Sequence, residues 1–201
     1  MALTGRPRSE DARRAILRAA CDLVRERGFA ALTIEGIASR AGVGKTTIYR
    51  HWPNKAAVVM DALLTETDRR IPVPDTGSVR DDLRQQMLGV VNVLGDPADG
   101  GVYVALLAEA QRDATLAAAI REQFIATRRA QTTSTLERGI ARGELPDDLN
   151  RDVVIDALYG ALYYRLLVRH APVVPTYIEQ VIDLVLPSVA AHTTAPSATS
   201  T

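Results

Sequence analysis

A short segment near the N-terminus concentrates side chains whose chemistry suits DNA. It contains Lys45, Thr46, Thr47, Tyr49, Arg50, His51 and, a few residues further on, Lys55. Threonine can contact base edges or a thymine methyl group, whereas Lys, Arg, His and Tyr donate hydrogen bonds to phosphates. We therefore predict that this segment binds double-stranded DNA, with Thr46 and Thr47 at the bases and the other residues at the backbone.

Two short helices joined by a glycine turn are expected to position these side chains. Thr33 can cap the first helix, in which apolar residues recur at helical spacing at Ile34, Ile37, Ala38 and Ala41. Gly42 follows, where the end of a helix often requires a positive φ. The second helix runs from about Gly44 to His51 and ends before Pro53, because the residue before a proline disfavours the α region. This is the arrangement of a helix-turn-helix, which places its second helix in the major groove.

The second helix also separates an inner face from an outer one. Ile48 lies five residues after Val43, and both are expected to turn toward the core. Asn54 can cap the following helix, whose unpaired backbone N–H groups form a phosphate site together with Lys55. The alternative is an ordinary helical corner with a solvated basic face. We disfavour it, because such a corner has no reason to carry Gly, Lys, Thr-Thr, Tyr, His and Asn-Lys in this order.

Residues 10–63 resemble the DNA-binding domain of the tetracycline-repressor (TetR) family of bacterial transcriptional regulators. The resemblance rests on ILRAACDLVRERGFAALTIEGIA, on the turn AGVGKTTIYRHW and on PNKAAVVMDAL. Trp52 is a departure, since Phe is more usual there. The resemblance implies DNA contacts from Thr33, Lys45, Thr46, Thr47, Tyr49, Arg50, His51 and Lys55. It leaves Glu35 two roles, as an acceptor for a cytosine amino group or as support for the helix N-terminus, and we favour the second.

Charge is divided unevenly along the 201 residues, although the net charge is zero. Residues 1–56 carry 11 Lys and Arg against 5 Asp and Glu, a net of +6, and the remainder carries a net of −6. A basic N-terminal quarter followed by an acidic remainder is typical of a DNA-binding module attached to a body that does not touch DNA. Hydrophobic residues make up 47% of the chain, which is enough for a packed core.

The sequence gives little support for an enzyme, a metal site or a bound cofactor. Cys21 is the only cysteine, so no internal disulfide is expected, and it should be a small core residue. The three histidines, His51, His170 and His192, are far apart and lack metal-ligand spacing. A helical enzyme therefore remains only a weak alternative. Without a signal peptide or an apolar run of about 20 residues, the protein is expected to be cytoplasmic and to have no membrane partner.

The pattern stays helical to the C-terminal tail, so the expected fold is all-α with about nine helices. Residues 1–8 form a flexible basic arm, whose Arg6 and Arg8 either enter a minor groove or stay solvated. A proline-rich stretch, IPVPDTG, marks the main boundary. We divide the rest into a helix-turn-helix domain (9–53), a connecting helix and linker (54–77), a C-terminal ligand-binding and dimerisation domain (78–192) and a disordered tail (193–201).

The last two helices carry apolar residues on nearly every side, from Val153 to Val168 and from Tyr177 to Val189. Such helices must be covered on both faces, and a second copy of the pair is the simplest cover, giving a four-helix bundle. The expected interface residues are Leu158, Leu162, Leu166, Ile178, Ile182 and Val185. A homodimer also matches a palindromic operator with half-sites about 34–36 Å apart or a multiple of that distance. The alternative is a monomer that buries both helices centrally.

The family resemblance implies that the central helices, about 78–142, enclose a pocket for a small-molecule effector. By helix face, the candidates are Met87, Val91, Tyr103, Leu107, Phe124, Arg128, Tyr159 and Tyr163. Plain core packing is the competing interpretation for each, and the adjacent Arg129 could replace Arg128 as the inward cation. The expected function is a repressor that leaves its operator when the effector binds. An architectural DNA-binding protein without a ligand is the alternative.

Overall fold

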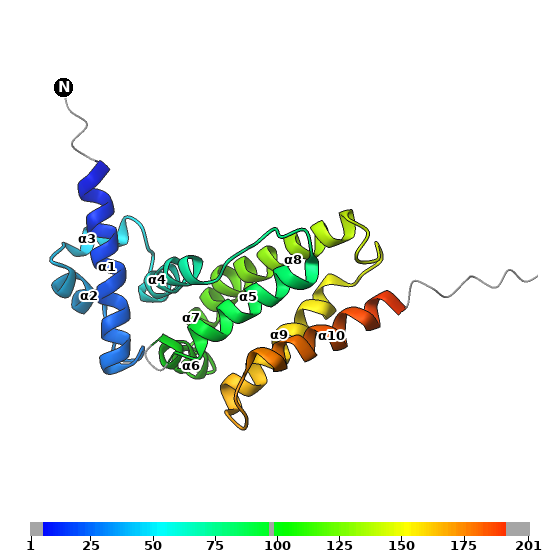
Figure 1. Cartoon of the computed structure of the whole chain (residues 1–201). Coiled ribbons are helices and arrows are strands. Elements are labelled where there is room, and N and C mark those ends of the chain that lie inside the picture. Colours follow the sequence, from blue (N-terminus) through cyan, green and yellow to red (C-terminus); the bar gives the residue numbers. More distant parts are fainter. Residues whose placement is uncertain (1–5, 97–98, 192–201) are drawn as a thin grey trace, which may run out of the picture. The chain divides into compact units, whose positions relative to one another are not determined.

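Every regular element in the described part of the chain is helical (Figure 1). The structure is a computed structural model that describes residues 6–96 and 99–191. Its elements are α1 (Arg6–Arg27), α2 (Ile34–Ala41), α3 (Lys45–Tyr49), α4 (Lys55–Arg70), α5 (Val79–Leu94), α6 (Asp99–Ala110), α7 (Ala114–Ala119), η1 (Ile120–Ile125), α8 (Ala126–Ala141), α9 (Arg151–Val168) and α10 (Pro175–Ala191). Because α7, η1 and α8 follow one another without a break, the described residues form nine continuous helices. The predicted all-α fold with about nine helices is confirmed.

Helix α1 begins at Arg6, inside the segment that we expected to be a flexible arm. Pro7 is compatible with this start, because proline fits the first turn of a helix, where an N–H would have no partner within the helix. Residues 6–8 are therefore helical, contrary to that expectation. Residues 1–5 and the expected tail, 193–201, lie outside the described residues.

A π-helical turn, η1, interrupts the long helix that runs from Ala114 to Ala141. Asp113 caps the start of this helix by accepting a hydrogen bond from the backbone N–H of Leu116 at 2.9 Å. A π turn closes its hydrogen bonds over one more residue than an α turn. So small a change in spacing within one turn is not visible in the apolar pattern of the sequence.

The chain folds into two compact units. Unit 1 comprises residues 1–69 and 96–127, and unit 2 comprises residues 70–95 and 128–201. The chain thus leaves unit 1 and later returns to it, so that α6 packs with α1. We expected one main boundary at the proline-rich stretch, because a sequence pattern shows where a helix breaks. The pattern does not show which helices pack together, so it could not predict the return of the chain to unit 1.

Unit 1 has a core formed by the apolar faces of α1 to α4. Helix α1 contributes five buried residues, Ile16, Leu17, Ala20, Leu23 and Val24. Helix α4 contributes Val58, Val59, Ala62 and Leu63, which are buried too. Ile37 of α2 and Ile48 of α3 are completely buried and hold both short helices against this core.

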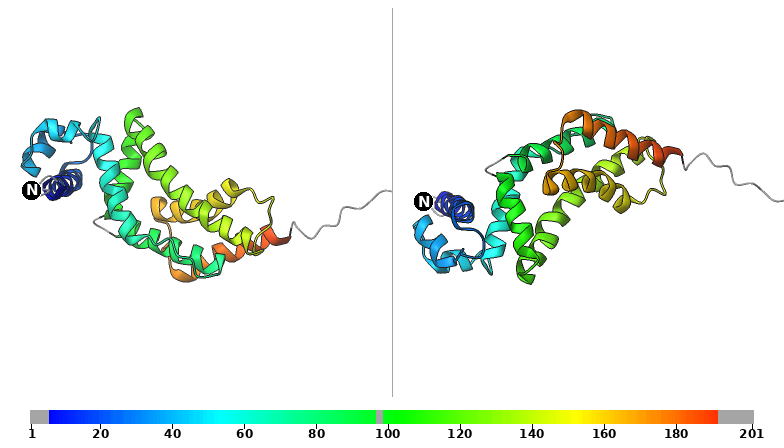
Figure 2. Two further views of the ribbon diagram at one scale, coloured as in Figure 1. Left: turned by 90° about the horizontal axis from the view of Figure 1, so that it is seen from above. Right: turned by 90° about the horizontal axis from the view of Figure 1, so that it is seen from below.

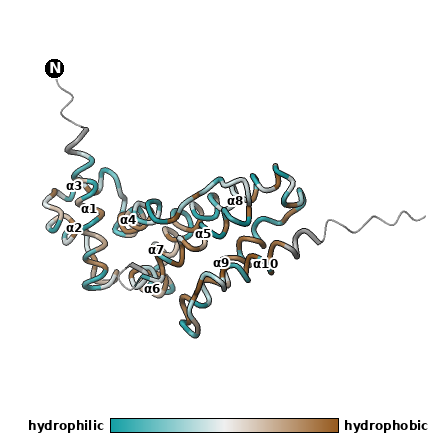
Figure 3. The backbone as a smooth tube through the Cα atoms, viewed as in Figure 1, coloured by the Kyte–Doolittle hydropathy of each residue, from teal (hydrophilic) through white to brown (hydrophobic). Residues whose placement is uncertain are grey.

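Unit 2 contains α5, α8, α9 and α10 around a second apolar core, and α10 lies beside both α5 and α9 (Figure 2). Completely buried side chains at its centre include Leu83, Met87, Leu136, Leu158, Leu162, Ile178 and Ile182. Two ion pairs join α5 to α10, Arg80 with Asp183 at 2.7 Å and Arg84 with Glu179 at 2.8 Å. Hydrophobic residues run along both α9 and α10 (Figure 3), which agrees with their apolar sequences.

A buried carboxylate holds the proline-rich segment 71–77 in unit 2. The Oδ1 atom of Asp82 accepts hydrogen bonds from the backbone N–H and the hydroxyl of Thr76, both at 2.8 Å. Its Oδ2 atom lies 3.5 Å from Nη2 of Arg138. Burial opposes ionisation of Asp82, but the hydrogen bonds from Thr76 and the charge of Arg138 outweigh it, so the pKa of this carboxyl is lowered.

Replacing Asp82 with Asn should lower the free energy of unfolding by about 1–3 kcal/mol at pH 7, because the buried partners lose a charged acceptor. Since the folded-state pKa of Asp82 is lowered, its contribution is present above the unfolded-state pKa of about 3.9 and disappears as the pH falls below it. Urea unfolding at several pH values should therefore show the two proteins converging in acid. The exposed Asp148→Asn serves as control, and a pH-independent gap between wild type and Asp82→Asn would contradict this assignment.

Candidate DNA interface

Helix α2, which precedes the turn to α3, has defined caps at both of its ends. Thr33 caps α2, and its Oγ1 atom accepts a hydrogen bond from the backbone N–H of Gly36 at 3.0 Å. Gly42 ends α2 with φ 66° and ψ 34°, a left-handed conformation that favours glycine. The N–H of Val43 then bonds to the carbonyl of Ala38 at 3.0 Å, which closes the turn. The predicted helix-turn-helix geometry is therefore present.

Helix α3 presents its polar side chains outward around one buried anchor. Ile48 is 0% exposed, and Trp52 just beyond the helix is 5% exposed, so both side chains fix α3 to the core of unit 1. The predicted contacts on the other side are Thr46, Tyr49, Arg50 and His51, all exposed, together with the half-buried Thr47. Regular helix ends at Tyr49, two residues before the predicted end, and turn hydrogen bonds carry the chain to Trp52.

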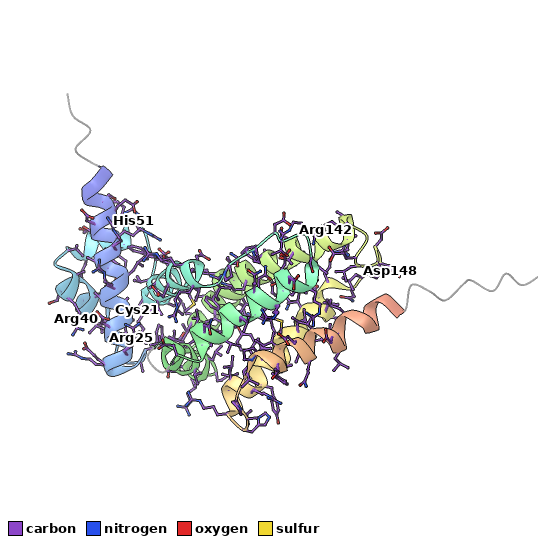
Figure 4. All side chains as sticks on the ribbon, in the orientation of Figure 1. Cys21, Arg25, Arg40, His51, Arg142 and Asp148 are labelled. Atoms are coloured by element: carbon purple, nitrogen blue, oxygen red, sulfur yellow. The ribbon has the colours of Figure 1, made fainter. Side chains whose placement is uncertain are left out.

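A recess of about 240 Å³ lies between α1 and α3 at this surface. It is lined by Ser9, Ala12, Arg13 and Ile16 of α1 and by Thr47, Arg50 and His51 from α3 and the residues that follow it. His51 is labelled beside α1 in Figure 4. Our sequence reasoning missed Ser9 and Arg13, because nothing in their spacing relative to α3 shows that the first half of α1 runs past it.

Lys45 is paired with Glu35 across the turn, with Nζ and Oε1 3.0 Å apart. Their hydrogen bond raises the pKa of Lys45 and lowers that of Glu35. Both side chains are more than half exposed, and exposed pairs of this kind are weak. Lys45 can therefore exchange Glu35 for another anion at little cost. Glu35 also lies in the first turn of α2, where a carboxylate favours the helix dipole, in agreement with the role that we preferred.

Lys55 makes contacts that sequence reasoning did not anticipate. Its ammonium group donates to the carbonyls of Phe29 and Leu32 at 3.0 Å and of Ala30 at 3.3 Å. The same group lies 4.5 Å from the centre of the Phe29 ring. An ammonium has three hydrogens to donate, and three carbonyls accept them here. Lys55 thus attaches the start of α4 to the turn between α1 and α2.

Asp61 provides a second connection between α4 and the helix-turn-helix. One carboxylate oxygen accepts from Arg13 of α1 at 2.6 Å, and the other accepts from the indole N–H of Trp52 at 2.9 Å. Together with Lys55, it joins α4 to α1, to the turn before α2 and to the end of α3. The family's usual Phe at the position of Trp52 has no such N–H, so this bond depends on the departure noted in the sequence.

The remaining predicted DNA contacts, Arg6 and Arg8, lie in the first turns of α1, and their side chains are outside the described residues.

The predicted effector residues divide between the units. Tyr103, Leu107 and Phe124 belong to unit 1, where the rings of Tyr103 and Phe124 are 5.1 Å apart; Met87, Val91, Arg128, Tyr159 and Tyr163 belong to unit 2. Arg128 bonds to Gln131 at 3.0 Å, whereas Arg129 bridges Asp152 and Asp156 on α9.

The predicted dimer residues require a correction. Leu158, Leu162, Ile178 and Ile182 are 0% exposed inside unit 2, and Leu166 and Val185 are partly buried against the same core. Completely buried side chains of one protomer cannot form a surface for another. The sequence could not distinguish the two faces, because both are apolar. Among the described side chains of α9 and α10, the exposed large apolar residues are instead Val153, Tyr164, Leu167, Val168 and Leu184.

Two further observations concern chemistry other than DNA binding. Within residues 6–96 and 99–191, no group of His, Cys, Asp and Glu side chains is arranged to hold a metal ion. None of the helices described is long and apolar enough to span a bilayer.

A short helix anchored by Ile48 and facing solvent with Thr, Tyr, Arg and His defines a helix-turn-helix transcriptional regulator. The sequence matches the family model "Bacterial regulatory proteins, tetR family" over residues 16–62 and the model "Tetracyclin repressor-like, C-terminal domain" over residues 73–185. The chain belongs to the TetR family of transcriptional regulators, as the resemblance implied.

Sequence and structural similarity to individual proteins supports this membership. The chain is 43% identical to the uncharacterized HTH-type transcriptional regulator YdeS of Bacillus subtilis, over 89% of each chain. It is 29% identical to the DNA-binding transcriptional repressor TetR of Mycobacteroides abscessus, over 89% of this chain and 94% of that one. The crystal structure of the TetR family transcription regulator SCO0332 superimposes with a TM-score of 0.76 at 34% identity, covering 89% of this chain and 98% of that one.

Replacing Lys55 with Met should lower the free energy of unfolding by about 1–3 kcal/mol, because two partly buried carbonyls and an exposed one lose their donor. The matched change, Lys45→Met, removes an exposed ion pair and should alter stability by less than about 0.5 kcal/mol. Chemical denaturation followed by the fluorescence of Trp52 measures both. Equal losses in the two variants would show that the three carbonyl contacts do not stabilise unit 1.

Proposed function

We propose that this regulator is a dimeric repressor whose two α3 helices occupy the half-sites of a palindromic operator and leave it when a small molecule binds. The observation that carries the proposal is the outward row of Thr46, Tyr49, Arg50 and His51 above the buried Ile48. A helix held from beneath with a polar and cationic outer face has the form needed to enter a major groove.

Each side chain of the interface takes a role that follows from its place. Thr46 and Thr47, at the start of α3, contact bases, and Tyr49 contacts the phosphates beside them. Arg50 and His51 line the recess next to α1, so a phosphate lying over it receives hydrogen bonds from both. Lys45 transfers from Glu35 to a neighbouring phosphate. Lys55 acts indirectly, since its ammonium already binds the carbonyls before α2.

A second copy of the chain is the proposed cover for the exposed apolar face of α9 and α10. Val153 and Tyr164 are each 61% exposed, and Leu184 is 73% exposed. Along α9, residues 153, 157, 160, 164 and 167 follow one another at intervals of four and three, which forms one stripe on a helix. At Gly160 an added Cβ would meet nothing within 4 Å, so the surface is open there. An isologous contact of this stripe gives the two-fold symmetry that a palindrome requires.

Release of the operator follows from two arrangements of the dimer that differ in the spacing of the α3 helices. The effector must bind more tightly to the arrangement that does not fit the operator, and its differential affinity sets the extent of release. Helix α4 leads directly into unit 2 at Arg70. Because Lys55 and Asp61 attach α4 to α1, to the turn before α2 and to the end of α3, a displaced α4 carries the helix-turn-helix with it as one body.

Replacing Arg50 with Ala should weaken binding to all DNA sequences alike and reduce the slope of log K against log salt by about 1, because one phosphate contact is lost. Thr47→Ala should instead change sequence preference. Fluorescence anisotropy on the sequence enriched from a random duplex library measures both effects. Arg25→Ala, which removes an exposed arginine of α1, is the matched control. If Arg25→Ala reduced the slope as much as Arg50→Ala, the placement of the interface at α3 would be wrong.

Replacing Leu184 with Glu should yield a folded monomer that has lost at least tenfold in operator affinity, because a buried charge opposes the dimer contact. Leu162→Glu should unfold unit 2 instead, since Leu162 is 0% exposed within the protomer. Light scattering and thermal unfolding distinguish these outcomes, and Ala130→Glu on the exposed side of α8 is the control. A dimeric, operator-binding Leu184→Glu variant would exclude this face as the interface.

A further inference from the structure

Buried and partly buried polar side chains from three helices lie together within the apolar core of unit 2. Thr132 and Thr135 lie on one face of α8 and are 3% and 0% exposed. Gln86 of α5 is 3% exposed, and Tyr159 of α9 packs against the same core. These four residues, which we call the polar row, occupy positions where a packed core normally places apolar side chains.

The polar row contains two hydrogen-bonded pairs. Nε2 of Gln86 donates to Oγ1 of Thr135 at 2.7 Å, and the hydroxyl of Thr132 donates to that of Tyr159 at 3.2 Å. Arg138 also donates to Oγ1 of Thr135, at 3.2 Å. Both hydrogen bonds that join two helices within the polar row therefore involve a side chain of α8.

One polar atom of the row has no partner among the described residues. Oε1 of Gln86 is buried and accepts no hydrogen bond. A carboxamide carries both an acceptor oxygen and a donor nitrogen, and Thr135 engages only one of the two. Exchanging the two ends of the amide would leave the nitrogen unpartnered instead. A buried polar group in this state is costly, and a molecule bound beside it would remove the cost.

We propose that Gln86, Thr132 and Tyr159 recognise the effector, and that the effector is an uncharged molecule with an N–H or O–H group beside an apolar or aromatic body. The inference deepens the proposed function and rests on it, because it assumes that unit 2 receives the effector. The donor group bonds to Oε1 of Gln86. The apolar body lies against Met87 and Val90, the neighbours of Gln86 on α5.

The charges around the polar row support a neutral ligand. Burial raises the pKa of Tyr159 to about 12, so its hydroxyl stays protonated at physiological pH. Arg138 is paired with Asp75 at 3.4 Å and Asp82 at 3.5 Å. A carboxylate placed at Gln86 would bring a negative charge to the amide oxygen. Arg128, one turn along α8, donates to Gln131, and it is the cation that an anionic ligand would have to recruit.

Three probes of one shape test the proposal by thermal unfolding of the full-length protein. Benzamide is neutral and has an N–H donor, α-methylstyrene is its apolar equivalent, and benzoate is its anionic equivalent. We expect benzamide to raise the unfolding temperature with increasing concentration and the other two to have less than a third of its effect. Gln86→Leu should abolish the benzamide shift and be at least as stable as wild type without probe, because the unpartnered atom is gone. The exposed neighbour Gln85→Leu should keep the shift.

Several results would overturn the proposal. These are equal shifts from all three probes, a larger shift from benzoate, no shift from any probe, or a Gln86→Leu variant that still responds to benzamide. Gel-shift titration of the ligand-free protein with the selected operator separates this outcome from failure of the proposed function. If the protein binds no DNA, the repressor proposal fails whatever the probes do. If the probes behave as expected while DNA stays bound, the polar row is a binding site and induction through it is excluded.

Discussion

The attachment of α4 to the helix-turn-helix determines how the proposed DNA-binding surface of α3 is held. One ammonium group, that of Lys55, binds three carbonyls at the turn before α2, and one carboxylate, that of Asp61, binds both α1 and Trp52. Both contacts are partly shielded from water. In such surroundings, hydrogen bonds to charged groups are stronger than those between neutral groups. Ile48 adds a buried apolar contact from beneath α3. The orientation of the outer side chains of α3 is therefore fixed by Ile48, Lys55 and Asp61, which lie outside the proposed DNA contacts.

The same constraint limits the ways in which unit 1 can respond to a ligand. If α3 were held only by its short connections, it could rotate alone. A bound ligand would then have to change the orientation of that single helix. With α4 attached at two places, the four helices behave as one body. In the proposed mechanism, the transition that changes operator affinity is then a change in the position of whole helix-turn-helix units in the two copies of the dimer.

The local sequence was enough to predict much of the site, because its signals are short-range. The caps at Thr33 and Asn54, the positive φ at Gly42 and the inward turn of Ile48 follow from neighbours only a few residues away. The contacts of Lys55 could not be predicted in this way, since their partners lie 23 to 26 residues earlier. The sequence likewise could not predict which face of α9 is exposed, because Leu162 and Tyr164 are both apolar enough to lie on either face of the helix. Only the packing of α5 and α10 shows that the first is buried and the second is exposed.

The pairing of Lys45 with Glu35 has a consequence for the search along genomic DNA. In the proposed interface, Lys45 meets DNA with a counterion that is part of its own chain. On the proposed transfer of Lys45 to a phosphate, Glu35 is left in the negative field of the duplex and attracts a cation from solution, so the net release of mobile ions is smaller than for a solvated lysine. The pair thus reduces the attraction to arbitrary sequences, where no base contacts compensate. It leaves a larger share of the total affinity to the groups that distinguish one base pair from another.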